Sequence, residues 1–534
     1  MTTKDTNQCA RSRWMLGYLM LTAMVCGALV MVVEVLGSRV IGPFFGVSLF
    51  IWTSLISVTL ISLSLGYAIG GYLADRRATA EFLFGIILLA GIAVIIIPYV
   101  KSPVLQFCVP FGLRIGSFAS TAILFGPSLI LLGCVSPYLI KITAKELKNI
   151  GQIVGGFYAL STVGSVIGTV VTGFVLIAYM GVNSIFHLVG TLLVILALGY
   201  FVVFKRIWWT ATLVLIPVVM MAYTTDTMPD VVMNNGTRVS LVASHDSYYG
   251  NLKVVDYRYQ DVHTREMMID GLIQGGVDRN TGESIYTYPY FMAYLPFALA
   301  DKIQSCLVIG LGAGIVPKWY EQRGVRTDVV DINPAVFDFA RIYFGVTVSG
   351  DEIQEDARYF LQYSDKTYDV VVLDVFNGDT TPGHLLSLEA LRLLEKRLTR
   401  QGMLTINLAG SLYKNTYMTA SVVRTLKTIF DQVDIFPTAD PEKTGGKLNL
   451  VILAYNGSER TLDFDQAPDF KISSFARQDV FNNIGRRFYF PENTPSIILM
   501  DDYNPIDFFD AELKENVRKN ILETTEWDIL TYSG

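Results

Sequence analysis

Three acidic residues and a glycine-rich turn in the second half of the chain have the types and spacing of a nucleoside-binding site. The turn, Gly310-Leu311-Gly312-Ala313-Gly314, directly follows the apolar run CLVI. Glycine suits such a turn because side chains would keep a ligand away from the backbone and from the start of the next helix. The pattern G-x-G-x-G is a weak signal alone, since dinucleotide sites use G-x-G-x-x-G. Acids that end or follow the next apolar strands strengthen it, namely Asp331, Asp356 and Asp374.

Each acid suits a different part of the chemistry. Asp331, 17 residues after Gly314, can accept hydrogen bonds from a ribose. Glu355-Asp356-Ala357 can accept from the exocyclic amine of an adenine, and Asp374 stands where a reacting atom would lie. Each acid taken singly is equally well explained as a helix cap or a turn residue. All three behind one glycine turn favour a nucleoside site.

A repeated pattern of apolar strand, turn and helix, which begins at Ile303, positions the turn and the acids. The strands are the runs CLVIG, TDVVD, YDVVVLD, GMLTINL and LNLVILAY. Apolar strands separated by helices predict an open, doubly wound parallel α/β sheet covered on both faces, with its ligand at the carboxyl ends of the strands. Residues 231–275 instead alternate apolar and polar residues in short runs, which predicts a small antiparallel sheet.

The first half of the chain has the composition of a membrane domain. The 534 residues are 51% hydrophobic and 17% charged, which excludes a disordered chain, a collagen-like fibre and a small disulfide scaffold. Residues 1–223 hold 13 Lys and Arg against 5 Asp and Glu, a net charge of +8, so the remainder of the −6 chain carries −14. A membrane-spanning helix needs roughly 20 apolar residues. Seven such spans are predicted, near residues 14–36, 48–73, 82–100, 119–140, 154–180, 184–204 and 207–223.

Lysine and arginine beside the spans predict the orientation. They gather at the N-terminus and after the second, fourth and sixth spans, whereas the opposite loops carry Arg39, Lys101 and Arg114, with Arg238 further along. Positive flanks stay in the cytoplasm, so the pattern predicts a multi-pass protein of the cell (inner) membrane with a cytoplasmic N-terminus. With seven spans the acidic second half lies outside the cytoplasm, and with an even number it lies inside.

Short motifs give the chain a specific resemblance. The motifs that follow the order of spermidine synthases are Ser247-Tyr248-Tyr249-Gly250-Asn251-Leu252, Met268-Ile269-Asp270-Gly271 with Gln274, the glycine turn, Val330-Asp331-Ile332, Glu355-Asp356-Ala357 and Tyr368-Asp369-Val370-Val371-Val372-Leu373-Asp374. Nearly the whole chain resembles the membrane-fused spermidine synthase-like (polyamine aminopropyltransferase) family, in which a seven-helix module precedes this domain. The resemblance implies a transmembrane domain in 1–223, a small β-domain in 224–300, a Rossmann-like domain in 301–460 and a C-terminal extension in 461–534.

The resemblance implies a transferase that moves an aminopropyl group from decarboxylated S-adenosylmethionine to an amine such as putrescine or another polyamine. Asp331 would hold the ribose and Asp356 the adenine. Gln274 and the glycine turn would hold the aminopropyl arm, and Asp374 would act as the base or amine-orienting carboxylate. A sulfonium leaves readily, so positioning and a proton acceptor suffice and no metal is expected. The expected cofactor-binding residues are Gln274, Gly310, Gly312, Gly314, Asp331, Asp356 and Ala357.

Departures from the family pattern affect both substrates. Ala313 stands where the family usually carries an Asp that would repel the carboxylate of intact S-adenosylmethionine, so methyl or aminocarboxypropyl transfer from that cofactor is the alternative. Asn377 replaces the second Asp of the acceptor loop, and Asp379 can supply the missing charge. Of the family's Tyr-His-Glu only Tyr286 is kept, and the tyrosine expected within 438–441 is absent. The predicted catalytic residues are Asp374 and Asp379, and the predicted acceptor-binding residues are Tyr286, Asn377 and Asp379.

Other functions and partners stay open. Met500-Asp501-Asp502-Tyr503-Asn504-Pro505 resembles a turn of the fused family that closes over the acceptor, although a plain Asn-Pro turn is the simpler explanation. A non-catalytic transporter or sensor that binds a polyamine or a nucleoside is a third function. The expected partners are a small-molecule amine and the lipid bilayer; no nucleic acid is expected, and a homo-oligomer is left open.

Overall fold

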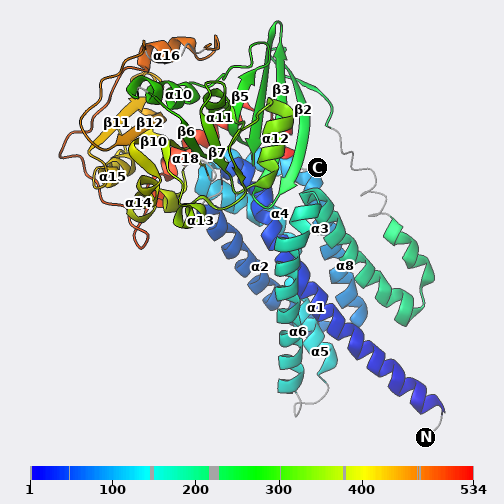
Figure 1. The fold of residues 1–534 in the computed structure, drawn as a ribbon. Helices are drawn as coiled ribbons and strands as arrows, with labels where there is room; N and C mark the ends of the chain where they lie inside the picture. The colour runs from blue at the N-terminus through cyan, green and yellow to red at the C-terminus, as the bar shows by residue number, and fades with distance from the viewer. Residues whose placement is uncertain are drawn as a thin grey trace. The chain divides into compact units, whose positions relative to one another are not determined.

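The computed structural model describes residues 3–46, 49–144, 150–215, 228–300, 302–376, 381–465, 467 and 471–532. The chain divides into two compact units, Met1–Met228 with Leu530–Gly534, and Pro229–Ile529. The first unit is helical, and the second holds both β-sheets (Figure 1).

The first unit consists mainly of long helices. Its elements are α1 (Thr3–Phe45), α2 (Leu49–Arg76), α3 (Ala80–Cys108), η1 (Val109–Phe111), α4 (Gly112–Gly133), α5 (Val135–Thr143), α6 (Ile150–Val171), the π-helix η3 (Thr172–Leu176), α7 (Ile177–Tyr179), α8 (Val182–Lys205) and the 3-10 helix η4 (Trp208–Val214). Five helical stretches among the described residues are long and apolar enough to cross a membrane: Arg13–Phe45, Phe50–Arg76, Ala80–Thr143, Ile150–Tyr179 and Val182–Lys205.

These stretches overlap the first six predicted spans. The stretch Ala80–Thr143 contains two of them, because α3 and α4 are separate helices that pack against each other. The seventh predicted span, 207–223, is described only as far as residue 215, and this described part includes η4. The number of membrane spans therefore stays a prediction.

Small residues let the helices of this unit pack closely. A Cβ on Gly164 of α6 would lie 1.9 Å from the carbonyl oxygen of Met24 in α1, and a Cβ on Gly70 of α2 would lie 2.6 Å from the Cα of Cys134. The backbones therefore touch at these crossings, as small residues allow in membrane helix pairs. Close packing accounts for the small-residue run that contains Gly70.

The second unit begins with a small antiparallel sheet, as predicted. Its strands are β1 (Val231–Val232), β2 (Arg238–Ser247), β3 (Gly250–Tyr259), β4 (Val262–Ile269) and β5 (Leu272–Asp278), hydrogen-bonded in sequence order. The turn between β4 and β5, Asp270-Gly271, has φ values of 47° and 74°, the positive values that a type I′ hairpin needs. Beyond a bulge, the β4–β5 register sets Glu266 opposite Gly276.

The larger sheet has the strand order β11-β12-β10-β9-β6-β7-β8. Its strands are β6 (Ser305–Ile309), β7 (Arg326–Val330), β8 (Glu352–Ile353), β9 (Tyr368–Leu373), β10 (Leu398–Ser411), β11 (Gln432–Pro437) and β12 (Lys447–Tyr455). From β6 the chain adds β7 and β8 on one side of the sheet, and then returns to add β9 and β10 on the other side. β6 and β9 are parallel neighbours, and doubly wound sheets bind ligands at the carboxyl ends of the two strands where the order changes in this way. Gly310, Asp331 and Asp374 directly follow β6, β7 and β9, so they meet at this edge.

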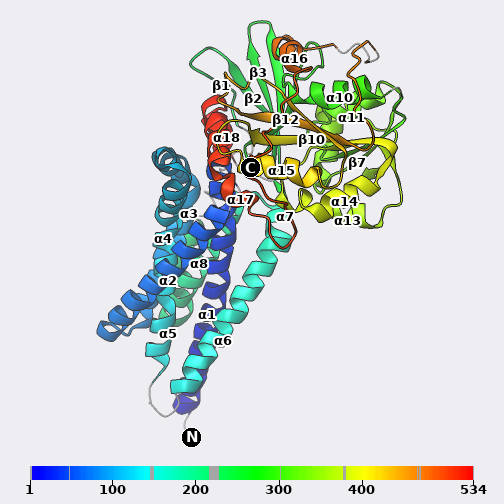
Figure 2. The ribbon, with the colours of Figure 1, turned by 90° about the vertical axis from the view of Figure 1, so that its left-hand side faces the viewer.

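The sheet departs from the parallel prediction at one strand. β12 pairs antiparallel with both β10 and β11, and Figure 2 shows it beside β10. The connection between β11 and β12, residues 438–446, is shorter than the dozen or more residues that a crossover to a parallel strand needs. The run LNLVILAY is therefore a buried strand, but it runs in the opposite direction because it returns directly from β11.

Helices cover both faces of the larger sheet. Side chains of β9 alternate between two cores: Val370 and Val372 pack with α10, α11 and α12, whereas Val371 and Leu373 pack with α13, α14 and α15. Burial on both faces explains why these strands are continuous apolar runs. The helices of this part are α10 (Tyr288–Leu299), α11 (Ile315–Glu321), α12 (Pro334–Phe344), α13 (Ala357–Tyr363), η5 (Gly383–Leu385), α14 (Leu388–Lys396), α15 (Tyr417–Leu426), α16 (Arg477–Asn483), α17 (Ile506–Phe509), α18 (Ala511–Thr524) and α19 (Trp527–Thr531).

Candidate active site

The glycine turn lies between two other predicted site residues. Gly310 has a φ of 90°, and a Cβ there would lie 2.1 Å from the carbonyl oxygen of Asp374. Gly312 has a φ of 49°, and its Cβ would lie 2.6 Å from the carbonyl oxygen of Gln274. Neither position therefore tolerates a side chain. The turn brings Gln274 of β5 and Asp374 after β9 into one site.

Asp331 holds the same turn in place. The Leu311 N–H donates to its Oδ2 at 2.9 Å, and the Asn333 N–H donates to its Oδ1 at 2.8 Å. Burial raises the pKa of Asp331, and these two backbone donors oppose the rise. Each carboxylate oxygen keeps a second lone pair, so ribose hydroxyls can bind while the turn stays fixed. Asp331 thus fits both the structural and the ribose-binding interpretation.

Asp356 is the N-cap of α13. Its Oδ1 accepts from the Tyr359 N–H at 3.0 Å, which is the helix-cap role that the sequence left open. The other oxygen lies 4.0 Å from His384 Nε2, and the side chain is 43% exposed, so it remains accessible to an adenine amine. Ala357 is the first residue of α13 and is buried. The adenine role of both residues stays a prediction.

Asp374 is held at the carboxyl end of β9 by the neighbouring strands. Its N–H donates to the Ile309 carbonyl oxygen at 2.9 Å, and its Oδ1 accepts from Asn407 Nδ2 at 2.8 Å. The β9–β10 register explains the hydrogen bond from Asn407. Leu373 lies opposite Ile406, so the residues that follow them, Asp374 and Asn407, lie side by side. Burial raises the pKa of Asp374 to about 6, which the Asn407 hydrogen bond partly opposes.

Asn407 was not predicted from the sequence. Its side chain is 1% exposed, and its Oδ1 has no hydrogen-bond partner within the described part of the chain. A buried acceptor without a donor carries a free-energy cost that a ligand N–H would remove. The only sequence signal is one amide side chain within the apolar run LTINL.

Two further groups join the site through Tyr286. The Tyr286 hydroxyl donates to Glu266 Oε1 at 2.6 Å, and burial raises the pKa of Glu266. Tyr288 begins α10 beside Tyr286, and burial and then the charge of Asp374 raise its pKa well above 10.0. The charge of Asp374 is therefore felt at the start of α10, two residues after Tyr286. Glu266 and Tyr288 were not predicted, although Glu266 is the single acid in the run EMMI.

The C-terminal turn 500–505 contacts the segment that follows Asp374. Arg358 of α13 pairs with Asp501, with Nη1 donating to Oδ1 at 2.7 Å. The Asn504 side chain donates to the Gly383 carbonyl oxygen at 2.7 Å. The turn thus fixes the described part of this segment. Asn377 and Asp379 lie outside the described residues, so their predicted roles are untested.

Comparison with known proteins gives relatives of two kinds. No family model matches the chain. The chain is 31% identical over 273 residues to the N-terminal histidine N-methyltransferase of Emericella nidulans, covering 47% of this chain and 48% of that protein. It is 27% identical over 183 residues to the polyamine aminopropyltransferase of Vibrio vulnificus, covering 33% of this chain and 59% of that protein. The chain thus spans about half to three fifths of the length of these curated relatives.

Among solved structures, a probable spermidine synthase from Corynebacterium glutamicum is similar to this chain. The sequence identity is 17% and the TM-score 0.37, and the match covers 41% of this chain and 81% of that one. Further curated relatives include polyamine aminopropyltransferase 2 of Pseudomonas aeruginosa, 27% identical over 219 residues, with 37% of this chain and 61% of that protein covered. The curated relatives support a polyamine aminopropyltransferase-like family for the chain, at low identity, in agreement with the resemblance drawn from its sequence. Because a methyltransferase is also among them, the comparisons support a transferase and leave the transferred group open.

Proposed function

We propose that the chain is a membrane-anchored transferase that moves an aminopropyl group from decarboxylated S-adenosylmethionine to an amine acceptor such as putrescine or another polyamine. The observation that carries the proposal is Asp374, a half-buried carboxylate whose pKa is raised to about 6. Such a group is ionised at neutral pH and basic enough to take a proton from an ammonium group. Its backbone lies directly against Gly310 of the turn that would hold the nucleoside.

The reaction needs a neutral amine nitrogen aimed at a carbon. Asp374 receives one proton from the acceptor ammonium, and Asn407 Oδ1 accepts a hydrogen bond from a remaining N–H and so orients the nitrogen lone pair. The nitrogen then bonds to the propyl carbon next to the sulfonium. The bond between that carbon and sulfur breaks, its electron pair goes to sulfur, and methylthioadenosine leaves. Because a sulfonium leaves readily, positioning accounts for most of the expected catalysis.

An S-adenosylmethionine-type co-substrate fits the residues around the turn. Asp331 would accept from the ribose, Asp356 with Ala357 would contact the adenine, and Gln274 with the glycine turn would hold the aminopropyl arm. The close approach of the Gly312 backbone to Gln274 supports this placement, since Gly310 of the same turn lies against Asp374. Asn377 and Asp379 are acceptor-binding candidates, and Asp379 a second candidate base, on the resemblance alone.

A calorimetric titration of the purified full-length protein with decarboxylated S-adenosylmethionine tests the co-substrate. We expect binding, and we expect Asp331→Asn to weaken it, because an amide has only one oxygen to share between the backbone donors and the ribose. A folded protein that does not bind this compound contradicts the proposal.

Methyl transfer from intact S-adenosylmethionine is the second candidate function. Ala313, 2% exposed within the glycine turn, offers no carboxylate to repel that of the intact cofactor. The Emericella nidulans relative is also named as a methyltransferase. Titration with both cofactors separates the candidates: aminopropyl transfer predicts tighter binding of the decarboxylated form, and methyl transfer predicts the reverse.

We also propose that the first unit anchors the enzyme in the cell membrane through seven spans, with the second unit outside the cytoplasm. The five apolar helical stretches and the positive flanks support this orientation. The boundaries after residues 223, 300 and 460 belong to the same proposal. A reporter enzyme that works only in the cytoplasm, fused near Asp246, should be inactive, and an active fusion would contradict the seven-span arrangement.

A further inference from the structure

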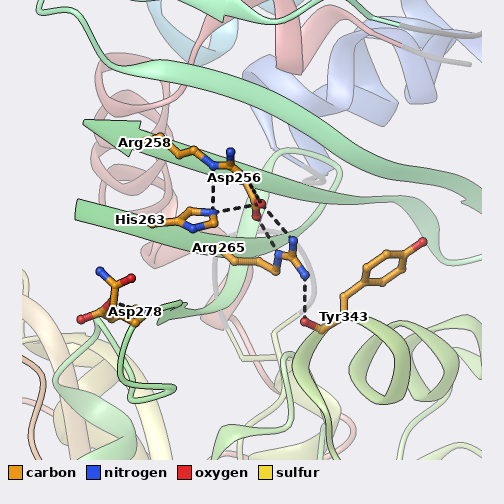
Figure 3. Close-up of polar contacts among 7 residues, drawn as sticks. Asp256, Arg258, His263, Arg265, Asp278 and Tyr343 are labelled. Atoms are coloured by element: carbon orange, nitrogen blue, oxygen red, sulfur yellow. Dashed lines mark hydrogen bonds and ion pairs between the residues drawn. The ribbon is translucent and has the colours of Figure 1, made fainter. Parts of the chain in front are cut away.

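The small sheet is joined to α12 at both ends of that helix. Near its end, the Tyr343 carbonyl oxygen accepts from Arg265 Nη1 of β4 at 3.1 Å, and Asp256 of β3 fixes the same guanidinium group through bonds of 2.7 and 2.9 Å (Figure 3). At its start, the N-cap residue Asn333 donates from Nδ2 to Ser247 Oγ of β2 at 3.1 Å. None of these bonds is made by β5, the last strand of the small sheet.

The C-terminal helix α18 connects β5 to the larger sheet, because it packs against both β5 and β10. Arg518, which is 4% exposed, donates from Nη1 to the Asp270 carbonyl oxygen at 3.2 Å. In the first turn of α18, Glu512 Oε1 accepts from Lys447 Nζ at 2.8 Å. Lys447 lies opposite Ser411, the last residue of β10. The helix thus contacts the turn before β5 and the carboxyl end of β10.

Both contacts lie near groups of the candidate active site. Asp270 precedes Gln274 by four residues, and the backbone of Gln274 lies against the glycine turn. Ser411 follows Asn407 by four residues, and Asn407 is bonded to Asp374. The helix therefore joins the two strands that carry Gln274 and Asn407.

Stability alone does not account for a buried arginine in α18. Arg518 shares its buried face of the helix with the apolar residues Leu513 and Ile521. An apolar side chain of similar size would fill the same space without the cost of removing a charge from water. The arginine adds an N–H bonded to one carbonyl oxygen, and a hydrogen bond constrains distance and direction as apolar contacts do not. Arg518 therefore fixes the position of the turn before β5.

The end of the C-terminal segment is anchored separately. Lys253 of β3, also 4% exposed, donates from Nζ to the Ile529 carbonyl oxygen of α19 at 2.6 Å. The last carbonyl groups of a helix have no partner within it, and a lysine can supply one. The segment that contains α18 is thus held at its start by Glu512 and beyond its end by Lys253.

We propose that the C-terminal helix α18 positions Gln274 relative to Asp374 for the transfer. Arg518 and Glu512 are its positioning residues. The inference rests on the proposed function, in which Gln274 holds the aminopropyl arm and Asp374 the attacking nitrogen. The rate then depends on how the two groups are aligned, and a misplacement of about 1 Å can cost about 100-fold. Asp331 and the glycine turn belong to the larger sheet, so binding of the nucleoside should not depend on α18.

Arg518→Met tests the inference through a split between turnover and nucleoside binding. In the purified full-length protein we expect kcat, measured as methylthioadenosine release, to fall by about 10- to 100-fold, because the turn before β5 loses the bond that fixes it. The Kd of methylthioadenosine, measured by calorimetry, should stay unchanged. Arg518→Lys keeps a charged donor and should recover part of the rate.

Lys519→Met is the matched control. Lys519 is the next residue of the same helix, but its side chain is 73% exposed, so this variant should behave as the wild type. Glu512→Gln changes an exposed side chain at the other contact and should lower kcat by a smaller factor, which tests the inference even where Arg518→Met does not fold. Wild-type kcat in folded Arg518→Met, or in Glu512→Gln where the first variant does not fold, would overturn the inference. Equal losses of kcat and of methylthioadenosine affinity would also overturn it.

Hydrogen–deuterium exchange distinguishes failure of this inference from failure of the proposed function. The amides of residues 268–275 should exchange faster in Arg518→Met than in the wild type, and those of residues 305–314 should not. If this pattern is found but the wild type forms no aminopropyl product, α18 still positions β5 and the proposed reaction is contradicted. If product forms and Arg518→Met changes neither kcat nor exchange, only the inference about α18 is contradicted.

Discussion

Asn407 donates from Nδ2 to Oδ1 of Asp374 at 2.8 Å and thereby joins β10 to the carboxyl end of β9. One neutral hydrogen bond does not compensate for the burial of a carboxylate, so the pKa of Asp374 remains raised at about 6. The pair thus combines a basic carboxylate with an amide oxygen that has no partner in the described structure.

Asp374→Asn should abolish most of the transfer activity, because an amide cannot take the proton of the acceptor ammonium. Loss of a general base lowers turnover by about 100- to 10,000-fold. The measurement is the rate of methylthioadenosine release at saturating substrates. Binding of the co-substrate should persist, since Asp331 and the glycine turn are unchanged.

Asp369→Asn is the matched control. Asp369 lies at the start of β9, the strand that Asp374 follows, and its Oδ2 accepts from the Gln304 and Ser305 N–H groups at 2.9 and 3.1 Å. Its loss should lower stability without removing the proton acceptor. Equal activity losses in the two variants would show that Asp374 acts only through the fold.

The pH dependence of kcat/KM should report the Asp374 carboxyl group. Its ionised form is the active one, so activity should rise as the pH increases through about 6, the pKa that burial produces. Asp374→Asn should lack this acidic limb. A profile that stays flat from about pH 5 to 7 would show that no group with this pKa controls the reaction.

A rise in pH should lower the folding stability of the wild-type protein, although it raises the activity. The folded-state pKa of Asp374, about 6, lies above the ordinary 3.8, so the folded protein holds this proton more tightly than the unfolded chain does. Folding is therefore weakened as the pH rises between these values, by up to about 3 kcal/mol above pH 6. Thermal unfolding should show Asp374→Asn to be more stable than the wild type at about pH 7.5, with a smaller gain near pH 5. A variant that is less stable at about pH 7.5 contradicts this prediction.

Gly310→Ala should disrupt the site more than a comparable change elsewhere. The new Cβ would lie 2.1 Å from the Asp374 carbonyl oxygen, at a φ of 90° that side chains rarely adopt. Gly324→Ala is the control, because Gly324 has a φ of 72° but open space around its Cβ position. Both variants should lose about 1 kcal/mol for the backbone conformation. Only Gly310→Ala should also lose co-substrate binding in calorimetry.

The sequence predicted the parts of the site that depend on local pattern. Strands buried on both faces are continuous apolar runs, so the acid after each run marks a carboxyl end, and Asp331 and Asp374 lie there. Asn407 depends instead on the pairing of β9 with β10, and Glu266 on a hydrogen bond to Tyr286, both between segments distant in sequence. The direction of β12 depends on a connection length that strand composition does not reveal.

The most direct test of the central claim is the mass of the product. The purified full-length protein is incubated with decarboxylated S-adenosylmethionine and putrescine, and both products are measured by mass spectrometry. We expect an amine that is heavier by one aminopropyl group, with one methylthioadenosine released for each. An amine heavier by one methyl group when intact S-adenosylmethionine is supplied, with no methylthioadenosine from the decarboxylated form, would contradict the proposed aminopropyl transfer.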